Sequence, residues 1–154
     1  MHGVTTVLIS EPDEQRRLLY TTALRDAGFH AIGAADSRAA LSEAALRAPA
    51  LIVVQLPGPT PDSLALCRQL RSETGKHRAP ILVLTHFDDA YSRDQIIGAG
   101  ATAVLIEPLK HHMLLVKSVK RLLMFSSGRR RAESDRSRNG ASAAHEEESG
   151  DLEG

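Results

Sequence analysis

Five short apolar runs constrain the fold of this chain more than any other feature of its sequence. Four are strong and cover residues 7–9, 50–54, 81–84 and 103–106, and a weaker one covers residues 29–32. The strong runs are continuously apolar rather than alternating, which is expected of parallel strands in a sheet covered by helices on both faces. The sequence therefore predicts five strands in one buried parallel sheet.

Helical periodicity fills the segments around these runs and predicts five helices. After Pro12, a first helix is expected to end at Gly28, a residue suited to a left-handed C-terminal cap. Ser37 is the predicted N-cap of the second helix, and Asp88 is the predicted cap of a fourth, over residues 88–99, whose apolar stripe is poor. The stripes expected to face the core are Leu19, Tyr20, Ala23, Leu24 and Ala27; Ala40, Leu41, Ala44, Ala45 and Ala48; Leu66, Cys67 and Leu70; and Leu115, Val116, Val119, Leu122 and Leu123.

This alternation predicts a three-layer α/β domain of the (βα)5 type, with parallel strands joined by right-handed crossovers. Ligands and reactions on doubly wound sheets are found at the carboxyl ends of the strands. The candidate functional residues are therefore those that end the apolar runs: Ser10, Glu11, Gln55, Thr85, His86 and Glu107.

The composition changes after Phe125, and this change sets the expected domain boundary. One folded domain is predicted over residues 1–125, since a chain of 154 residues suits a single core. Over residues 126–154 the only large aliphatic or aromatic residue is Leu152, so burial there cannot offset the entropy of ordering the chain. A disordered charged tail is predicted, with arginines in its first half and a run of acidic residues near its end.

Charge and cysteine content exclude several classes of protein. Lys plus Arg and Asp plus Glu both number 19, so the net charge is zero and no overall field favours nucleic acid or an anionic membrane. Cys67 is the only cysteine, which excludes an internal disulfide and fits a reducing compartment. Neither a signal peptide nor a long apolar span is present. We expect a soluble, cytoplasmic protein with Cys67 buried.

The sequence offers no recognisable cofactor, metal or catalytic motif. No G-x-G-x-x-G or P-loop follows the first apolar run, which disfavours nucleotide and flavin binding. The seven histidines form neither an i, i+4 pair nor a Cys-His cluster, and the Gly-x-Ser-x-Gly elbow of hydrolases is absent. We therefore expect no cofactor, no metal ion and no enzymatic activity.

Several segments, taken in order, resemble the receiver domain of two-component response regulators. The resemblance covers residues 4–124. It implies a flavodoxin-like sheet with strand order 2-1-3-4-5 and a role in phosphorelay signal transduction. The segments that carry it are 7–9, 14–19, 51–54, 64–71, 79–85, 98–101 and 107–109.

The resemblance also implies a phosphotransfer site, from which this sequence departs. Receivers carry an acidic pair that helps hold Mg²⁺, an acceptor Asp and a Lys that stabilises the product, because a carboxylate must attack and phosphoryl charge must be neutralised. The acidic pair corresponds here to Ser10 and Glu11, the acceptor to Gln55 or, in a shifted alignment, Val53, and the Lys to Glu107. Thr85 is retained at the end of the fourth strand, and Val104 stands at the family's aromatic switch position.

We therefore expect a stand-alone pseudo-receiver that binds protein partners independently of phosphorylation. By family resemblance, the binding face is the fourth helix, the fifth strand and the fifth helix. A membrane or nucleic-acid partner is not expected, and the identity of the partner and the oligomeric state are left open. Two alternatives remain: an active phosphoacceptor that uses an unconventional residue, and a small-ligand sensor at the strand-end crevice.

A purely structural interpretation of the site residues also stays open. Ser10 and Gln55 fit polar strand ends satisfied by loop backbone, and Thr85 fits a strand end without a signalling role. In this interpretation Glu11 and Glu107 are solvated, or Glu107 pairs with nearby Lys110.

Overall fold

The computed structural model describes residues 3–75 and 78–126. Its centre is a five-stranded parallel sheet with the order β2-β1-β3-β4-β5, which confirms the predicted fold class and strand order. Residues 127–154 of the predicted tail lie outside the described residues, and Ser126 is helical. The strands are β1 (Thr6–Ser10), β2 (His30–Ala34), β3 (Leu51–Gln55), β4 (Ile81–Thr85) and β5 (Ala103–Ile106).

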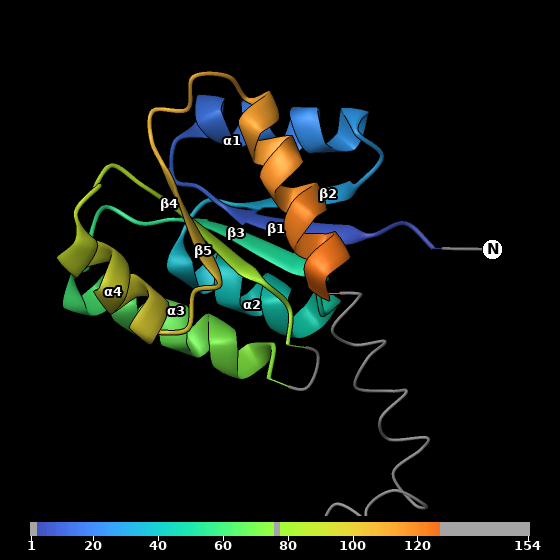
Figure 1. Ribbon diagram of the computed structural model, residues 1–154. Coiled ribbons are helices and arrows are strands. Elements are labelled where there is room, and N and C mark those ends of the chain that lie inside the picture. Colours follow the sequence, from blue (N-terminus) through green and yellow to red (C-terminus); the bar gives the residue numbers. More distant parts are fainter. Residues whose placement is uncertain (1–2, 76–77, 127–154) are drawn as a thin grey trace, which may run out of the picture. The chain divides into compact units, whose positions relative to one another are not determined.

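Helices cover both faces of the sheet, as the continuous apolar strands require. In Figure 1, α1 and the last helix, which covers residues 113–126, lie on one face, and α2, α3 and α4 lie on the other. In the described parts of the chain, no helix is long and apolar enough to cross a membrane. The bounds of the labelled helices are α1 (Glu14–Asp26), α2 (Ser37–Arg47), α3 (Pro61–Glu73) and α4 (Ala90–Gly98).

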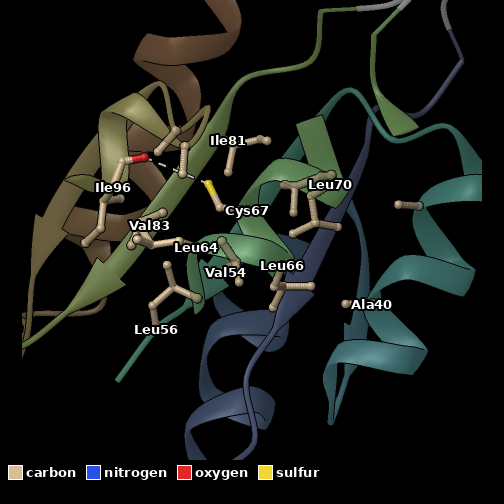
Figure 2. Packing of buried hydrophobic residues seen from close by; sticks show 14 of the residues in the cluster. Ala40, Val54, Leu56, Leu64, Leu66, Cys67, Leu70, Ile81, Val83 and Ile96 are labelled. Atoms are coloured by element: carbon tan, nitrogen blue, oxygen red, sulfur yellow. Dashed lines mark hydrogen bonds between the residues drawn. The ribbon is translucent and has the colours of Figure 1, made fainter. Parts of the chain in front are cut away.

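The larger of the two apolar cores lies between the sheet and α2, α3 and α4. Figure 2 shows Cys67 of α3 in its centre, surrounded by side chains such as Val83 from the sheet and Leu70 from the same helix. The thiol of Cys67 is fully buried and points toward the carbonyl oxygen of Ile96 in α4, with Sγ and O 4.0 Å apart. Cys67 therefore packs as a small buried apolar residue, as predicted.

The second core lies under α1 and the last helix. It includes Leu115, Val116 and Val119, which confirms the predicted stripe of the last helix, and Tyr20 and Leu24 of α1. Leu19, also placed in the core by the sequence pattern, is instead 47% exposed. The neighbouring residues Tyr20 and Thr21 are buried in its place. Thr21 can be buried at little cost because its hydroxyl donates to the Arg17 and Leu18 carbonyls.

Two of the predicted helix caps are displaced by one residue. Asp36 rather than Ser37 caps α2, and Asp89 rather than Asp88 caps α4; each carboxylate accepts the backbone N–H three residues on. In α2, Ala45 and Ala48 are exposed rather than buried. Gly28 has a φ of 98°, so the predicted left-handed residue after α1 is confirmed.

Candidate functional site

The candidate residues meet at the carboxyl edge of the sheet because the strands run in parallel and in register. Ser10 pairs with Val54, and Thr85 pairs with Ile106, so the strands reach this edge together. Two further backbone bonds extend the ladder beyond the strands: the Glu11 N–H donates to the Ala34 carbonyl at 2.9 Å, and the Glu107 N–H donates to the Thr85 carbonyl at 2.8 Å. Glu11 and Glu107 are thereby fixed in place at the edge.

Glu11 is held at the start of α1 by a local network. Its side chain is 1% exposed, and Oε2 accepts the Asp13 N–H at 3.0 Å while Oε1 lies 3.3 Å from Nε of Arg16. Burial raises the pKa of the Glu11 carboxyl; the Asp13 hydrogen bond and Arg16 oppose this rise, and the charge of Glu107 adds to it. Glu11 is therefore not the solvated carboxylate that the structural interpretation allowed.

Glu107 is buried against α1. It is 4% exposed, and the hydroxyl of Tyr20 donates to its Oε2 at 3.0 Å, across 87 residues of sequence. Burial, followed by the negative charge of Glu107 and the hydrogen bond to it, raises the pKa of the Tyr20 hydroxyl, which therefore remains a neutral donor. The expectation that Glu107 is solvated is wrong, since its carboxylate lies inside the domain and bonds to Tyr20.

Gln55 is the last residue of β3 and is partly exposed, whereas Val53 is fully buried in the core under α1. Thr85 at the end of β4 is fully buried, and its Oγ1 accepts the Phe87 N–H at 3.4 Å. Ser10, at the end of β1, is also buried. Of the two candidate acceptor positions, only Gln55 stands at the end of its strand.

The loop after β3 approaches the loop after β4 at Gly58. A Cβ at this position would lie 2.9 Å from the ring of Phe87, which follows β4, so the loop backbone and the ring are in close contact. At the neighbouring edge strand, Val104 is partly buried and packs against the core under α3 and α4. His86 is exposed.

Sequence reasoning missed Arg16 and the role of Tyr20. Tyr20 was placed in a core stripe, and its helical position is compatible with that stripe, but the pattern carries no sign of a partner at Glu107. Arg16 follows Glu11 by five residues, close enough in sequence for an ion pair across the helix start. Within the described residues, no group of three or more His, Cys, Asp or Glu side chains is arranged to hold a metal ion.

The strand order and the polar residues gathered at its carboxyl edge define a doubly wound α/β domain of the CheY-like kind. The sequence matches no protein-family model. It is 32% identical over 103 residues to the transcriptional regulatory protein PdtaR of Mycobacterium tuberculosis, covering 66% of this chain and 49% of the relative. It is 30% identical over 102 residues to the PhoP regulator of alkaline phosphatase synthesis from Bacillus subtilis, covering 66% and 42%.

The solved structures agree. The chemotaxis response regulator CheY4 of Vibrio cholerae matches with a TM-score of 0.70 and 25% identity, over 78% of this chain and 99% of that one. The chain carries a receiver domain of the two-component response-regulator family. It spans less than half of the length of the two curated relatives named above.

The magnesium ion that this family implies does not fit the residues present. Oε2 of Glu11 accepts the Asp13 N–H, and Oε1, which has no hydrogen-bond partner, lies 3.3 Å from Nε of Arg16, so a positive charge already faces this carboxylate. Ser10 and Gln55 at the neighbouring strand ends carry no charge. A hard divalent ion prefers several oxygen ligands including carboxylates. The second carboxylate at this edge, Glu107, follows β5, where the family has a lysine, and its Oε2 is already bonded to the Tyr20 hydroxyl.

Proposed function

We propose that this receiver domain is a pseudo-receiver, which acts in two-component signalling as a protein-binding module and does not accept a phosphoryl group. The observation that carries the proposal is that Gln55 ends β3 and that a buried Glu107, held by Tyr20, follows β5. A carboxamide cannot form an acyl phosphate, and a second negative charge repels a phosphoryl group where the family uses a lysine.

The polar contacts at the edge also support one fixed conformation. Receivers switch through movements at the end of β4 and in β5. Here Thr85 is fully buried, Val104 lacks the aromatic ring of the family, and Glu107 is bonded to α1. Under the proposal, the binding surface stays the same whether or not a phosphodonor is present.

The proposed binding surface is formed by α4, β5 and the last helix. Tyr91 of α4 is 70% exposed, and Ile97 of α4 and Met113 of the last helix are about two-fifths exposed. Exposed aromatic and methionine side chains are enriched in protein interfaces. A signalling protein is the proposed partner; the proposal includes neither catalysis nor binding of nucleic acid or membranes.

Incubation with Mg²⁺ and acetyl phosphate tests the first half of the proposal. We expect the mass of the protein to remain unchanged and its two-dimensional amide spectrum to be unaffected by Mg²⁺ with beryllofluoride. The matched control is the triple variant Ser10→Asp, Gln55→Asp, Glu107→Lys, which restores the family's residues and should respond. A phosphorylated species in the wild-type protein would establish an unconventional acceptor and end the proposal.

The second half is tested on a partner identified by affinity capture. In a direct binding titration, Tyr91→Ala should weaken binding at least tenfold, because exposed tyrosines often act as interface hot spots. Leu46→Ala, at a residue of α2 that is 72% exposed, should leave affinity unchanged. Equal loss in both variants, or affinity that depends on acetyl phosphate, would contradict a phosphorylation-independent surface on α4, β5 and the last helix.

A further inference from the structure

The guanidinium of Arg71, near the end of α3, is surrounded by oxygen atoms from three segments of the chain. Its Nε and Nη2 both donate to the Gly100 carbonyl, at 3.0 and 2.9 Å, and its Nη1 donates to the Ala79 carbonyl at 2.8 Å. The hydroxyls of Thr74 and Thr102 accept the remaining bonds, each at 3.2 Å. A guanidinium has a planar fork of N–H donors, and here all of its bonds are to neutral oxygens.

Most of these acceptors lie at the amino edge of the sheet, opposite the edge of the candidate site. Ala79 comes before β4, and Gly100 and Thr102 come between α4 and β5. The Thr102 hydroxyl also accepts the Ile81 N–H at 3.0 Å, and the Thr102 N–H donates to the Ile81 carbonyl at 2.8 Å. Arg71 therefore ties α3 to the place where the starts of β4 and β5 are joined.

The turn between α4 and β5 packs directly against the side chain of Arg71. Gly100 has a φ of 118°, and a Cβ at this position would lie 2.9 Å from Cβ of Arg71. The Gly100 N–H donates to the Ile97 carbonyl at 3.0 Å, and the Ala101 N–H donates to the Ile96 carbonyl at 3.3 Å. The last turn of α4 is therefore bonded to the same segment that Arg71 holds.

Little apolar burial holds α4 in place, which makes the contacts of Arg71 important for its position. Of the nine residues of α4, the buried ones are Ser92 and Ile96, whereas α3 buries five residues. Tyr91 and Ile97, which belong to the proposed binding surface, are exposed. Because apolar burial stabilises most packed helices, a helix with one buried large apolar side chain depends more strongly on polar contacts at its ends.

We propose that Arg71 is a positioning residue, which clamps the turn after α4 to α3 and thereby holds α4 and β5 in the arrangement that binds a partner. The clamp requires the fork of a guanidinium, because a lysine ammonium carries the same charge but has fewer donors and no planar geometry. The role of the surface that is held rests on the proposed function, whereas the clamp itself does not. Separate measurements therefore distinguish the two.

Amide hydrogen exchange of the full chain, followed by NMR, tests the clamp in Arg71→Lys. We expect the Gly100, Ala101 and Thr102 amides to exchange about tenfold faster than in wild type, or more, because one lost hydrogen bond to a charged group is worth about that factor. The amides of the central strand β1 report global unfolding and should change by a smaller factor.

The matched control for exchange is Arg68→Lys, the same substitution at an exposed arginine of the same helix. It should leave the exchange rates of the turn and of β1 unchanged. In Arg71→Lys, an equal change in the turn and in β1 would show a general loss of stability, and would overturn the clamp. Unchanged exchange in the turn would overturn it as well.

The wild-type protein provides a measurement that needs no substitution. The side-chain Nε–H of an arginine held by several hydrogen bonds exchanges with water more slowly than that of an exposed arginine. We expect the Nε–H of Arg71 to exchange about tenfold more slowly than that of Arg68, or slower still, in NMR of the ¹⁵N-labelled chain. Equal rates in the two side chains would show that the guanidinium is not held, and would overturn the proposal.

A binding titration with the captured partner tests what the clamp positions. Arg71→Lys should weaken the affinity about threefold or more, because only the fraction of molecules with α4 and β5 in place can bind, and Arg68→Lys should not. Faster exchange in the turn with unchanged affinity would overturn the positioning role. Should Tyr91→Ala also leave the affinity unchanged, the proposed binding surface falls as well; should it weaken binding, only the role of Arg71 falls.

Discussion

The core beneath α2, α3 and α4 and the carboxyl edge of the same sheet are built from the same strands but satisfy different requirements. In the core, residues such as Leu70 and Ile81 are fully buried among apolar neighbours, as the fold of a receiver needs. At the edge, one residue past the ends of β1 and β5, Glu11 and Glu107 are buried, and the exposed Arg16 forms an ion pair with Glu11. The apolar packing of a receiver is therefore kept here, although the carboxyl edge carries Glu107 where the family has a lysine.

Breaking the core should have the largest effect on stability. Leu70→Ala removes a fully buried side chain from α3 and should lower the free energy of unfolding by about 2–5 kcal/mol, because it loses apolar burial and leaves a cavity. Urea unfolding measures the change. Leu46→Ala, at a highly exposed position of α2, is the control and should change stability by less than about 0.5 kcal/mol. A similar loss in both variants would mean that the core is loosely packed.

Removing one hydrogen bond at the edge should cost less than the cavity. Tyr20→Phe leaves the ring in place but deprives Oε2 of Glu107 of its donor, so we expect a loss of about 1–3 kcal/mol at pH 8. The same substitution in a Glu107→Gln background should cost less, because a neutral acceptor is less expensive to leave unpaired. A double-mutant cycle by urea unfolding measures this coupling. Independent, additive effects would show that the Tyr20 hydroxyl does not stabilise Glu107.

The smallest expected effect lies at the start of α4, which is exposed. Asp89→Ala removes the N-cap that accepts the Ser92 N–H and hydroxyl and should lower thermal stability slightly at neutral pH. These hydrogen bonds lower the pKa of Asp89, so its contribution is present above the ordinary aspartate value and is lost as the pH falls through the lower folded value. The difference in melting temperature between the variant and wild type should therefore be smaller at pH 3 than at pH 7. A difference that persists in acid would contradict the capping role.

Much of the fold could be predicted from local patterns, whereas the site partners could not. Four strands followed from strong apolar runs because strands covered on both faces leave few polar positions. The edge strand β2, in which His30 is exposed, gave only the weaker run, and the last helix followed from its stripe. The caps of α2 and α4 were displaced by one residue because each has two adjacent residues capable of capping.

The side-chain environment of the edge depends on contacts between distant segments. The positions of Ser10, Gln55 and Thr85 followed from strand ends. Glu107, however, precedes Lys110 by only three residues, and a local argument favours solvent or that lysine. Its actual partner is Tyr20, which only the folding of α1 over the sheet brings close. Burial of a carboxylate is a tertiary outcome that a single sequence does not encode locally.

The single cysteine makes local opening between α3 and α4 measurable. Cys67 is the only cysteine of the chain, is fully buried against α4, and burial raises the pKa of its thiol. A thiol-specific reagent reacts with the thiolate and needs access to it, so labelling requires α3 and α4 to separate. The rate of labelling in the native protein therefore measures how often α3 and α4 separate, without any engineered probe.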